Sequence, residues 1–420
     1  MTTRHDCEAL DARDPLAALR RQFALPAGKI YLDGNSLGAL PKATAARVAE
    51  VVQREWGEHL IESWNSADWI HLPQRVGDKI ACLVGAAPGE LVAADSTSVN
   101  LFKVLSAALS IAAADAPGRR IILSERDNFP TDLYIAEALA RERGCTLELI
   151  DEPDAIKARL ARRDVAVLML TQVNYRTGRL HDMAALTCAA HDAGTLTVWD
   201  LAHSAGALPV HLKRDDADFA IGCGYKYLNG GPGAPAFVWA HPRHAERFWQ
   251  PLAGWMGHAA PFAFTPDYRP APGIARYLCG TPQVIGMSAL ECGVDSVLAA
   301  EPLGGMAALR EKSLALATLF MDLVAERCAG HGLECVTPRE TARRGSQVSF
   351  ARSEGGYAIV QALIARGVVG DFRAPDVLRF GFTPLYLRFV DVWDAVDHLR
   401  DVLDTGEWRD AKFQRKAAVT

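Results

Sequence analysis

One lysine in the chain has neighbours that would make its amine reactive. Lys226 lies between two tyrosines in a glycine-rich segment, Gly222 to Gly233. Aromatic neighbours keep water away from the amine, and desolvation lowers the pKa of a lysine and frees it to attack an aldehyde. The alternative is a glycine-rich turn that carries a surface lysine. Nucleotide binding is disfavoured, because Gly222 and Gly224 are not followed by the start of a helix.

A carboxylate precedes this lysine by about one strand–turn–strand unit. Asp200 directly follows an apolar run, Thr195 to Trp199, and His203 comes three residues later. In open α/β sheets ligands bind at the carboxyl ends of the strands, so a side chain at this point can reach a ligand. A carboxylate there can pair with a protonated pyridine nitrogen and keep the ring an electron sink. Asp200 could equally cap the helix that follows.

Two further motifs suit a phosphorylated aromatic ligand. The segment Asp95 to Asn100 places hydroxyls before an apolar helix expected from about Leu101, and a helix N-terminus binds anions such as phosphate. The segment Asn128 to Asp132 places Phe129 in a loop after a strand, where its ring can stack on a flat heteroaromatic ring. The structural alternatives are an ordinary Ser/Thr N-cap in the first segment and a capped turn in the second.

The middle of the chain alternates short apolar runs with helical patterns. Strands are predicted at residues 121–124, 147–150, 165–170, 195–199 and 219–221, and helices at residues 132–143 and 183–192. Alternation at this spacing indicates parallel strands joined by helical crossovers. The carboxylate and the lysine thus follow consecutive strands of one α/β domain.

The two ends of the chain have a different character. Before the alternating region we predict a helix at 16–23, a strand at 29–32 and a helix at 41–56. After it come helices at 288–299, 306–325 and 390–403 and strands at 347–350 and 377–380. We expect an N-terminal segment (1–30) packed on the small domain, a large α/β domain (31–285) and a small C-terminal α+β domain (286–420).

Composition and charge disfavour several classes of protein. The chain has 420 residues, too many for one ordinary core, and a net charge of −5. This charge and the absence of a basic run disfavour nucleic acid and anionic lipid as partners. The first twelve residues lack the apolar core of a signal peptide, and no uncharged run approaches the roughly 18 residues that span a membrane. We expect a cytoplasmic protein.

The cysteines and histidines predict neither disulfides nor a metal site. The nine cysteines are an odd number, are scattered and form no C-x-x-C pair. His241 and His244 form an H-x-x-H pair with Pro242 between them. A surface loop or helix explains this pair better than a zinc site.

The order of the four motifs is more specific than any one of them. A phosphate site, a stacking aromatic, an aspartate after a strand, a histidine and then a lysine resemble the class V aminotransferase group of pyridoxal-phosphate enzymes, over about Ile30 to Asp401. Within that group the chain most resembles the kynureninases. The matching blocks are Tyr31–Gly38, Phe129–Asp132, Trp199–Gly206, Tyr225–Asn229, Pro251–Trp255 with Gly257–His258, and Arg379–Tyr386.

The resemblance implies a fold and a cofactor site. The fold is type I among pyridoxal-phosphate (PLP) enzymes, a PLP-dependent transferase-like α/β architecture whose large domain has a mainly parallel seven-stranded sheet between helices. Lys226 then forms the Schiff base with pyridoxal 5'-phosphate, and Asp200 holds the pyridine nitrogen. The other implied contacts are His203, Phe129, Ser96, Thr97, Pro130, Thr131, Asp132 and Tyr225, with Trp255 and Thr281 reaching the phosphate from the other subunit of a homodimer. The family often has Asn where this chain has Thr281, and a hydroxyl can still donate one hydrogen bond.

The resemblance also implies a reaction. It is the hydrolytic Cβ–Cγ cleavage of L-kynurenine to anthranilate and L-alanine, or of 3-hydroxykynurenine to 3-hydroxyanthranilate. Lys226 would remove the α-proton, Tyr225 would transfer a proton at the carbonyl, and Arg379 would bind the substrate carboxylate. The sequence does not distinguish the two substrates, nor tryptophan catabolism through the kynurenine pathway from a biosynthetic role such as NAD biosynthesis.

The aryl pocket and the rival functions depend on fewer residues. Candidates for substrate contact are Asn35, Trp64, Trp69, His71 and Trp255, and the alternative for the aromatic residues is packing in a dimer interface. The nearest rival is a cysteine desulfurase or selenocysteine lyase, but the comparable segment, residues 366–373, has no nucleophilic cysteine. A second rival is a non-catalytic PLP-fold binding protein, which would not need an intact lysine, aspartate and arginine together.

Overall fold

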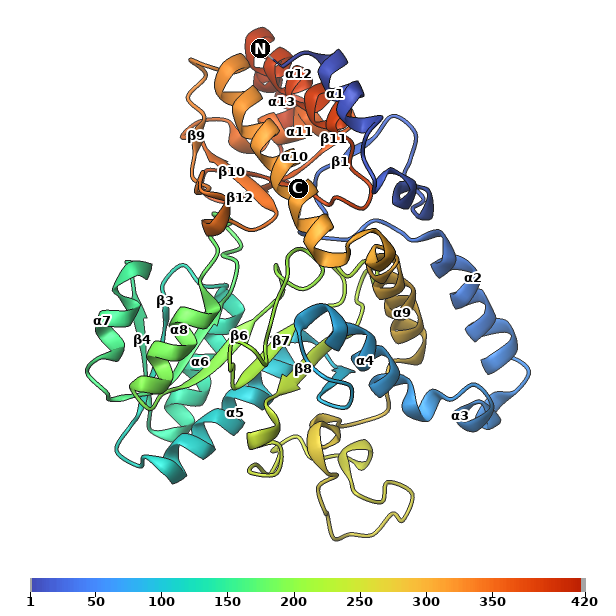
Figure 1. The fold of residues 1–420 in the computed structure, drawn as a ribbon, viewed down its shortest axis with the longest axis vertical. Coiled ribbons are helices and arrows are strands. Elements are labelled where there is room, and N and C mark those ends of the chain that lie inside the picture. The colour runs from blue at the N-terminus through green and yellow to red at the C-terminus, as the bar shows by residue number, and fades with distance from the viewer. Residues whose placement is uncertain (1, 417–420) are drawn as a thin grey trace.

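A seven-stranded sheet forms the centre of the larger lobe of the molecule (Figure 1). The structure is a computed structural model and describes residues 2–416. The strand order is β2-β8-β7-β6-β5-β3-β4, and β8 runs in the direction opposite to the other six strands, which confirms a mainly parallel sheet. The strands are β2 (Leu91–Ala94), β3 (Ile121–Glu125), β4 (Thr146–Ile150), β5 (Val165–Thr171), β6 (Leu196–Asp200), β7 (Phe219–Gly222) and β8 (Ala236–Ala240).

Helices cover both faces of this sheet, which explains why its strands are continuous apolar runs. One face packs against α5 and α6, and the other packs against α4 and α8. Successive side chains of β8 point to opposite faces, so Phe237 and Val238 belong to different hydrophobic clusters. The helices are α2 (Lys42–Glu50), α3 (Ser63–Ser66), α4 (Leu72–Val84), α5 (Thr97–Asp115), α6 (Pro130–Arg143), α7 (Ile156–Leu160), α8 (Met183–Asp192) and α9 (Val284–Leu298).

Among the strands and α-helices of this lobe, β2, β8, α3, α4 and α7 escape prediction from the sequence. Helix α4 contains Pro73 and Gly77, which usually argue against a helix. Pro73 lies in the first turn, where its missing N–H costs nothing. Gly77 packs so closely on β2 that an added Cβ would lie 2.2 Å from the Leu91 carbonyl oxygen. The packing against the sheet therefore decides this helix.

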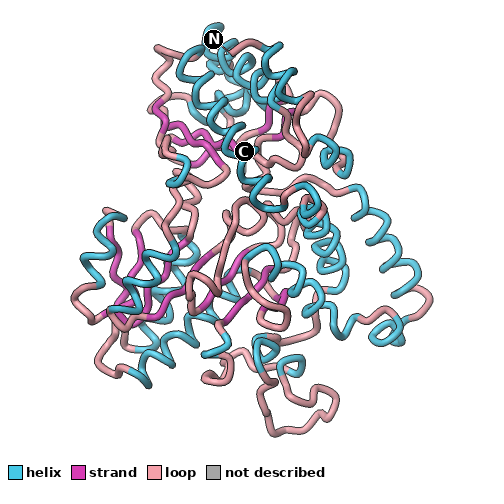
Figure 2. Tube along the Cα trace, in the orientation of Figure 1, coloured by secondary structure: helices cyan, strands magenta, loops and turns pink. Residues whose placement is uncertain are grey.

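A four-stranded antiparallel sheet with helices against it forms the smaller lobe (Figures 1 and 2). The strand order is β12-β13-β10-β9, and the two long helices α10 and α12 lie against each other. The strands are β9 (Glu334–Cys335), β10 (Gln347–Ala351), β12 (Asp371–Arg373) and β13 (Val377–Gly381). The helices are α10 (Gly305–Arg327), α11 (Gly356–Ala365), α12 (Phe389–Thr405) and α13 (Ala411–Gln414). This arrangement confirms an α+β fold for the C-terminal part.

The N-terminal segment contacts the smaller lobe. Helix α1 (Arg4–Asp11) lies against α12, where the Asp11 carboxylate accepts hydrogen bonds from the backbone N–H groups of Phe389 and Val390. Strand β1 (Ile30–Tyr31) pairs in parallel with β11 (Val368–Val369). Helix α9 lies against α2 and α4 of the larger lobe. The division at residues 30 and 285 stays a proposal.

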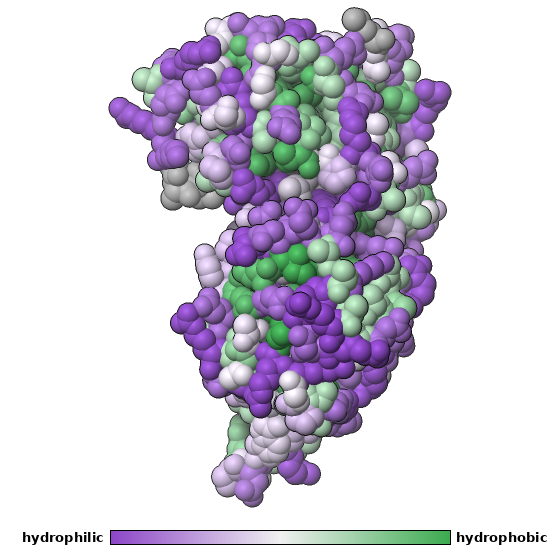
Figure 3. All heavy atoms as spheres, turned by 90° about the vertical axis from the view of Figure 1, so that its left-hand side faces the viewer, coloured by the Kyte–Doolittle hydropathy of each residue, from purple (hydrophilic) through white to green (hydrophobic). Residues whose placement is uncertain are grey.

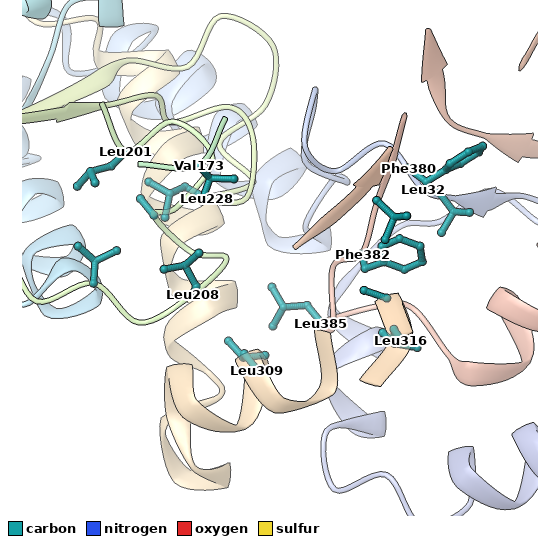
Figure 4. Close-up of a cluster of buried hydrophobic side chains, with 14 of the residues drawn as sticks. Leu32, Val173, Leu201, Leu208, Leu228, Leu309, Leu316, Phe380, Phe382 and Leu385 are labelled. Atoms are coloured by element: carbon teal, nitrogen blue, oxygen red, sulfur yellow. The ribbon is translucent and has the colours of Figure 1, made fainter. Parts of the chain in front are cut away.

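One hydrophobic cluster continues from the larger lobe into the smaller one, although the molecule narrows between them (Figure 3). Figure 4 shows the cluster with buried side chains from both lobes: Val173, Leu201, Leu208 and Leu228, and Leu32, Leu309, Leu316, Phe380, Phe382 and Leu385. Burying one such side chain contributes about 1.5–3 kcal/mol. The cluster therefore holds the lobes together and fixes the spacing between residues that come from different lobes.

Among the described helices, only α5 is long and apolar enough to cross a membrane by length and composition. Here Leu101, Val104 and Leu105 of α5 are fully buried in the cluster under the sheet. Lys103 is also buried, and its ammonium donates hydrogen bonds to the Asp95 carboxylate and the Tyr277 carbonyl, both at 2.5 Å. The apolar side chains of α5 therefore serve the core of the larger lobe.

Candidate active site

Three neighbouring parallel strands end side by side at one edge of the larger sheet. β5 ends at Thr171, β6 at Asp200 and β7 at Gly222. In the strand register Thr171 pairs with Asp200, and Asp200 pairs with Ile221. The segment after β7 carries Lys226. The predicted carboxylate and lysine meet because their strands are adjacent and end at the same edge.

A cavity lies at this edge of the sheet. It is lined by nine residues with predicted roles: Ser96, Thr97, Phe129, Thr131, Asp132, Asp200, His203, Tyr225 and Lys226. Four more lining residues had no predicted role: Ser98, Thr171, Tyr175 and Ala202. Ser98 was detectable as the third hydroxyl of its motif. Thr171 is the last residue of β5 and Tyr175 lies in the segment after it, and neither has a sequence signal for chemistry. The fold thus gathers motifs that are far apart in the chain.

The amine of Lys226 lies beside an uncharged histidine. Its Nζ atom is 3.0 Å from Nε2 of His203 and is 5.9 Å and 5.7 Å from the ring centroids of Phe129 and Tyr225. Burial lowers the pKa of His203 well below its ordinary value, and the positive charges of Lys226 and Arg379 lower it further. A neutral imidazole nitrogen can accept a hydrogen bond from the Lys226 ammonium.

Two buried carboxyl groups, Asp200 and Asp132, lie together at the cavity. The Asp200 Oδ1 atom accepts a hydrogen bond from the Ala202 N–H at 2.7 Å. Burial raises the pKa of Asp132 well above its ordinary value, and the charge of Asp200 and the hydrogen bond between the two raise it further. Two adjacent buried carboxyl groups cannot both ionise. Burial raises the pKa of Asp200 as well, but the charge of Lys226 and the hydrogen bond from Asp132 lower it, so we assign the proton to Asp132.

Helix α5 begins at the cavity. Ser96 is its N-cap, and the Ser96 hydroxyl accepts a hydrogen bond from the Val99 N–H at 3.3 Å. The sequence indicated a helix that starts near Leu101. The Ser96 cap instead places the start of the helix at Thr97. The first N–H groups of a helix have no acceptor within it, and the helix dipole is positive at this end. These groups, with the hydroxyls of Thr97 and Ser98, suit a phosphate.

An aromatic pair forms another wall of the cavity. Phe129 is 40% exposed, although it directly precedes α6 in the well-packed lobe. The Tyr175 ring meets it edge-on, with ring centroids 5.4 Å apart and an interplanar angle of 83°. A large apolar ring that stays exposed in a cavity suits stacking on a flat ligand.

Arg379 lies in a buried cluster with Asp371. Its Nε atom donates to Asp371 at 2.8 Å, Nη2 donates to Asp371 and, at 2.8 Å, to the Ser36 hydroxyl, and Nη1 donates to the Tyr175 carbonyl at 2.7 Å. Arg373 donates to the same Asp371 carboxylate at 2.8 Å. Sequence reasoning missed Ser36, Asp371 and Arg373 as members of a site, because their proximity depends on the pairing of β12 with β13 and of β1 with β11.

The other predicted site residues lie outside the Lys226 cavity of this chain. His71 is exposed, and Trp64 packs against Trp255 with ring centroids 5.7 Å apart. Thr281 lines a second cavity, and Asn35 is fully buried. Pro130 begins α6 between two residues of the Lys226 cavity. The roles given to these residues stay predictions.

The side chains around the Lys226 cavity fit pyridoxal 5'-phosphate. Asp200 is 4% exposed, and a buried carboxylate requires a cationic partner, which a protonated pyridine nitrogen would supply. The amine of Lys226 can bond to an aldehyde, and the α5 N-terminus can hold a phosphate. A protonated pyridine nitrogen, an aldehyde and a phosphate all belong to pyridoxal 5'-phosphate.

Curated relatives match this chain over its full length. A kynureninase from Pseudomonas fluorescens is 57% identical and one from Burkholderia pseudomallei (strain 1106a) is 58% identical, and both alignments cover 100% of this chain and 100% of the relative. The chain belongs to the kynureninase family. The family profile described as "Kynureninase C-terminal domain" matches residues 309–399. Membership in the kynureninase family confirms the resemblance inferred from the motifs.

Solved structures with the fold of this kynureninase-family chain are distant in sequence. The apo structure of a cysteine desulfurase from Thermococcus onnurineus NA1 has a TM-score of 0.77 and 20% identity, covering 92% of this chain and 98% of that chain. A mutant of C-DES with glycine covalently linked to the PLP cofactor has a TM-score of 0.78 and 17% identity, covering 91% of this chain and 99% of that chain. These likenesses confirm the type I fold, and at such identities they concern the fold alone.

Proposed function

We propose that this protein is a PLP-dependent hydrolase that cleaves the Cβ–Cγ bond of L-kynurenine to anthranilate and L-alanine. The observation that carries the proposal is the identity of 57% to 58% to kynureninases over the whole chain. The intact cavity around Lys226 supports it. In the reaction, water adds its oxygen to the aryl carbonyl carbon, which becomes the anthranilate carboxylate, and the β-carbon takes up a proton to become the methyl group of alanine.

Some of the cavity residues bind the cofactor, and others keep its pyridine nitrogen protonated. Lys226 holds it covalently, Phe129 stacks on its ring, and the N-terminus of α5 holds its phosphate. Asp200, with Asp132 as its hydrogen-bond donor, keeps the pyridine nitrogen protonated. When bound, PLP supplies an electron sink that stabilises negative charge on the substrate's α-carbon. Asp200 is thus the residue that maintains the strength of that sink.

Two side chains are placed to move protons. Burial raises the pKa of Tyr225, and the positive charge of Arg373 opposes this effect only in part. The Tyr225 phenol therefore keeps its proton at neutral pH and can serve as a general acid at the aryl carbonyl oxygen, a role that contributes about 10²–10⁴-fold. The Lys226 amine, once released, can remove the proton from the α-carbon, and the neutral His203 beside it can accept a hydrogen bond from the resulting ammonium.

A homodimer completes the site in this proposal. Ile61, Phe262 and Phe264 are 76%, 58% and 77% exposed in the single chain, and large apolar patches of this kind mark interfaces. Trp255 packs against Phe262 with ring centroids 5.7 Å apart, which places a predicted phosphate contact next to this surface. We place the protein in the cytoplasm and in tryptophan catabolism, with 3-hydroxykynurenine as a second substrate.

The proposed function is tested by adding L-kynurenine to the purified protein after supplying PLP. We expect fluorescent anthranilate and an equal amount of L-alanine, and no product from the Lys226→Ala variant. An active sample that releases sulfur from L-cysteine but no anthranilate would indicate a desulfurase. A protein that binds PLP but releases neither anthranilate nor sulfur would be a non-catalytic binding protein. Either result, desulfurase activity or binding alone, would contradict the proposal.

A further inference from the structure

A charged cluster with two arginines lies at the junction of the lobes. It contains Asp371, Arg373 and Arg379 from the β12–β13 hairpin and Asp33 and Ser36 from the turn after β1. The Ser36 hydroxyl donates a hydrogen bond to Asp371 at 2.8 Å, and Asp371 also accepts hydrogen bonds from both arginines. Asp371 is therefore the counter-ion that both guanidinium groups share.

The first arginine, Arg379, is almost fully used by the protein itself. It is 1% exposed. The edge formed by Nε and Nη2 is the edge that grips a carboxylate with two parallel hydrogen bonds. Asp371 already occupies this edge, and the Tyr175 carbonyl accepts from Nη1. A second carboxylate can bind Arg379 only through the N–H groups of Nη1 and Nη2 that do not already donate to Asp371, Ser36 or Tyr175.

The second arginine, Arg373, remains available. Its side chain is 38% exposed, and only its Nη2 atom donates to the cluster, to Asp371 at 2.8 Å and to the Ser36 hydroxyl at 3.3 Å. Within residues 2–416 its buried Nε atom has no hydrogen-bond acceptor. Its positive charge also acts on the cavity, because it contributes to the lowered pKa of His203, although less than burial and the charges of Lys226 and Arg379 do. It likewise opposes the rise that burial causes in the pKa of Tyr225. Arg373 therefore lies within electrostatic reach of Tyr225 and His203, both of which line the cavity.

The cluster has a net charge of about +1, which one bound anion would neutralise. Arg373 and Arg379 contribute two positive charges and Asp371 contributes one negative charge. Burial and the neighbouring Asp371 carboxylate together raise the pKa of Asp33 to about 7, so Asp33 carries little charge below that pH. A largely buried cluster with one uncompensated positive charge is stabilised by a ligand with a single carboxylate.

We propose that Arg373 binds the α-carboxylate of the amino-acid substrate, jointly with Arg379, and that Asp371 positions both guanidinium groups. This rests on the proposed function in that the substrate is an α-amino acid. It adds a second substrate-binding arginine to the one that the motif indicated. Asp371 is a positioning residue, because it acts through the two arginines.

Binding of two small ligands tests the proposal without turnover. L-Alanine and L-alaninamide differ only in the carboxylate, and each is titrated into the PLP-loaded protein while the cofactor absorbance is followed. For Arg373→Gln we expect a loss of L-alanine affinity of roughly 10- to 100-fold, as for a charge-assisted hydrogen-bonded pair. The affinity for L-alaninamide stays within about twofold of the wild-type value. Arg373→Lys, which keeps the charge but not the fork geometry, recovers part of the loss.

The control is Arg366→Gln. Arg366 is similarly buried, with a side chain 26% exposed, and binds Glu407 through two hydrogen bonds of 2.7 Å and 2.9 Å away from the cavity. It should leave both affinities unchanged, and thermal unfolding verifies that each variant is folded. Unchanged L-alanine affinity in Arg373→Gln, equal losses for both ligands, or a wild-type protein that does not prefer L-alanine would each overturn the proposal. A carboxylate preference that depends on Arg373 in a protein that does not cleave kynurenine would retain this inference and reject the proposed function.

Discussion

The Nε2 atom of His203 lies 3.0 Å from the Nζ atom of Lys226, so the amine that lines the cavity has a neutral nitrogen within hydrogen-bond distance. We expect Lys226→Ala to abolish covalent attachment of PLP, while His203→Gln retains it because the amide oxygen can still accept a hydrogen bond. Borohydride reduction followed by peptide mass spectrometry measures both. A PLP adduct on a Lys226→Ala protein would contradict the assignment of this lysine.

The Asp132–Asp200 pair predicts different effects for two substitutions at one position. Asp132→Asn keeps a neutral hydrogen-bond donor to Asp200, so PLP affinity should stay within about threefold of the wild-type value. Asp132→Ala leaves a buried acceptor unsatisfied, which costs about 1–3 kcal/mol, or roughly 5- to 160-fold in affinity. Fluorescence titration of the apoprotein with PLP measures both. Equal losses in the two variants would show that Asp132 is ionised rather than protonated.

The carboxyl of Asp33 predicts how substrate affinity depends on pH. Burial and the charge of Asp371 raise its pKa to about 7, although the charges of Arg379 and Arg373 act in the opposite direction. Below pH 7 the neutral Asp33 leaves the cluster with a net positive charge, and above pH 7 the ionised Asp33 cancels it. The KM for L-kynurenine should therefore rise above pH 7, by at most about tenfold per pH unit.

Asp33→Asn is the matched variant for this prediction, because it keeps the shape but cannot ionise. Its KM should stay low above pH 7, and the ratio of wild-type to variant KM removes the titration of the substrate itself. Steady-state kinetics between pH 6 and 8.5 give this ratio. A ratio that does not change with pH would show that Asp33 does not control substrate binding.

The sequence was sufficient to predict those site residues whose position depends only on the strand or helix next to them in the chain. Lys226 and Asp200 follow consecutive apolar strands, and Phe129 precedes the helix that its motif indicated. Prediction failed where partners come from distant segments. Arg373 and Ser36 have no local signal for chemistry, and they meet only because β1 pairs with β11 and β12 pairs with β13.

Asp218 and His191 predict a pH-dependent contribution to stability. Burial alone would raise the pKa of Asp218, but hydrogen bonds from His191, His244 and Arg243 hold it far below its ordinary range. The hydrogen bond to Asp218 raises the pKa of His191. The stabilisation by His191 is therefore complete below the unfolded-state pKa of about 6.5 and is lost as pH rises through the higher pKa of the folded state.

His191→Gln should consequently lower the free energy of unfolding more at pH 6 than at pH 9. A hydrogen bond between charged groups contributes roughly 1.5–3 kcal/mol, which is the expected loss at pH 6. The control is His331→Gln, because His331 pairs with Asp404, whose side chain is 55% exposed, and exposed pairs contribute about 0–1 kcal/mol. Urea denaturation at the two pH values measures both variants. Equal losses at pH 6 and pH 9 would mean that His191 is not charged in the folded protein.

The exposed apolar surface around Phe264 predicts that a single charge can weaken the homodimer. Phe264 is 77% exposed in the single chain and lies near Phe262, with ring centroids 6.2 Å apart. Phe264→Asp would bury a charge in the interface, and we expect the dimer dissociation constant to rise by roughly 30-fold or more, about 2 kcal/mol. The control is Tyr134→Asp on α6, where the ring is 68% exposed outside this surface. Sedimentation velocity measures the association, and a wild-type protein that sediments as a monomer at micromolar concentration would reject the shared site.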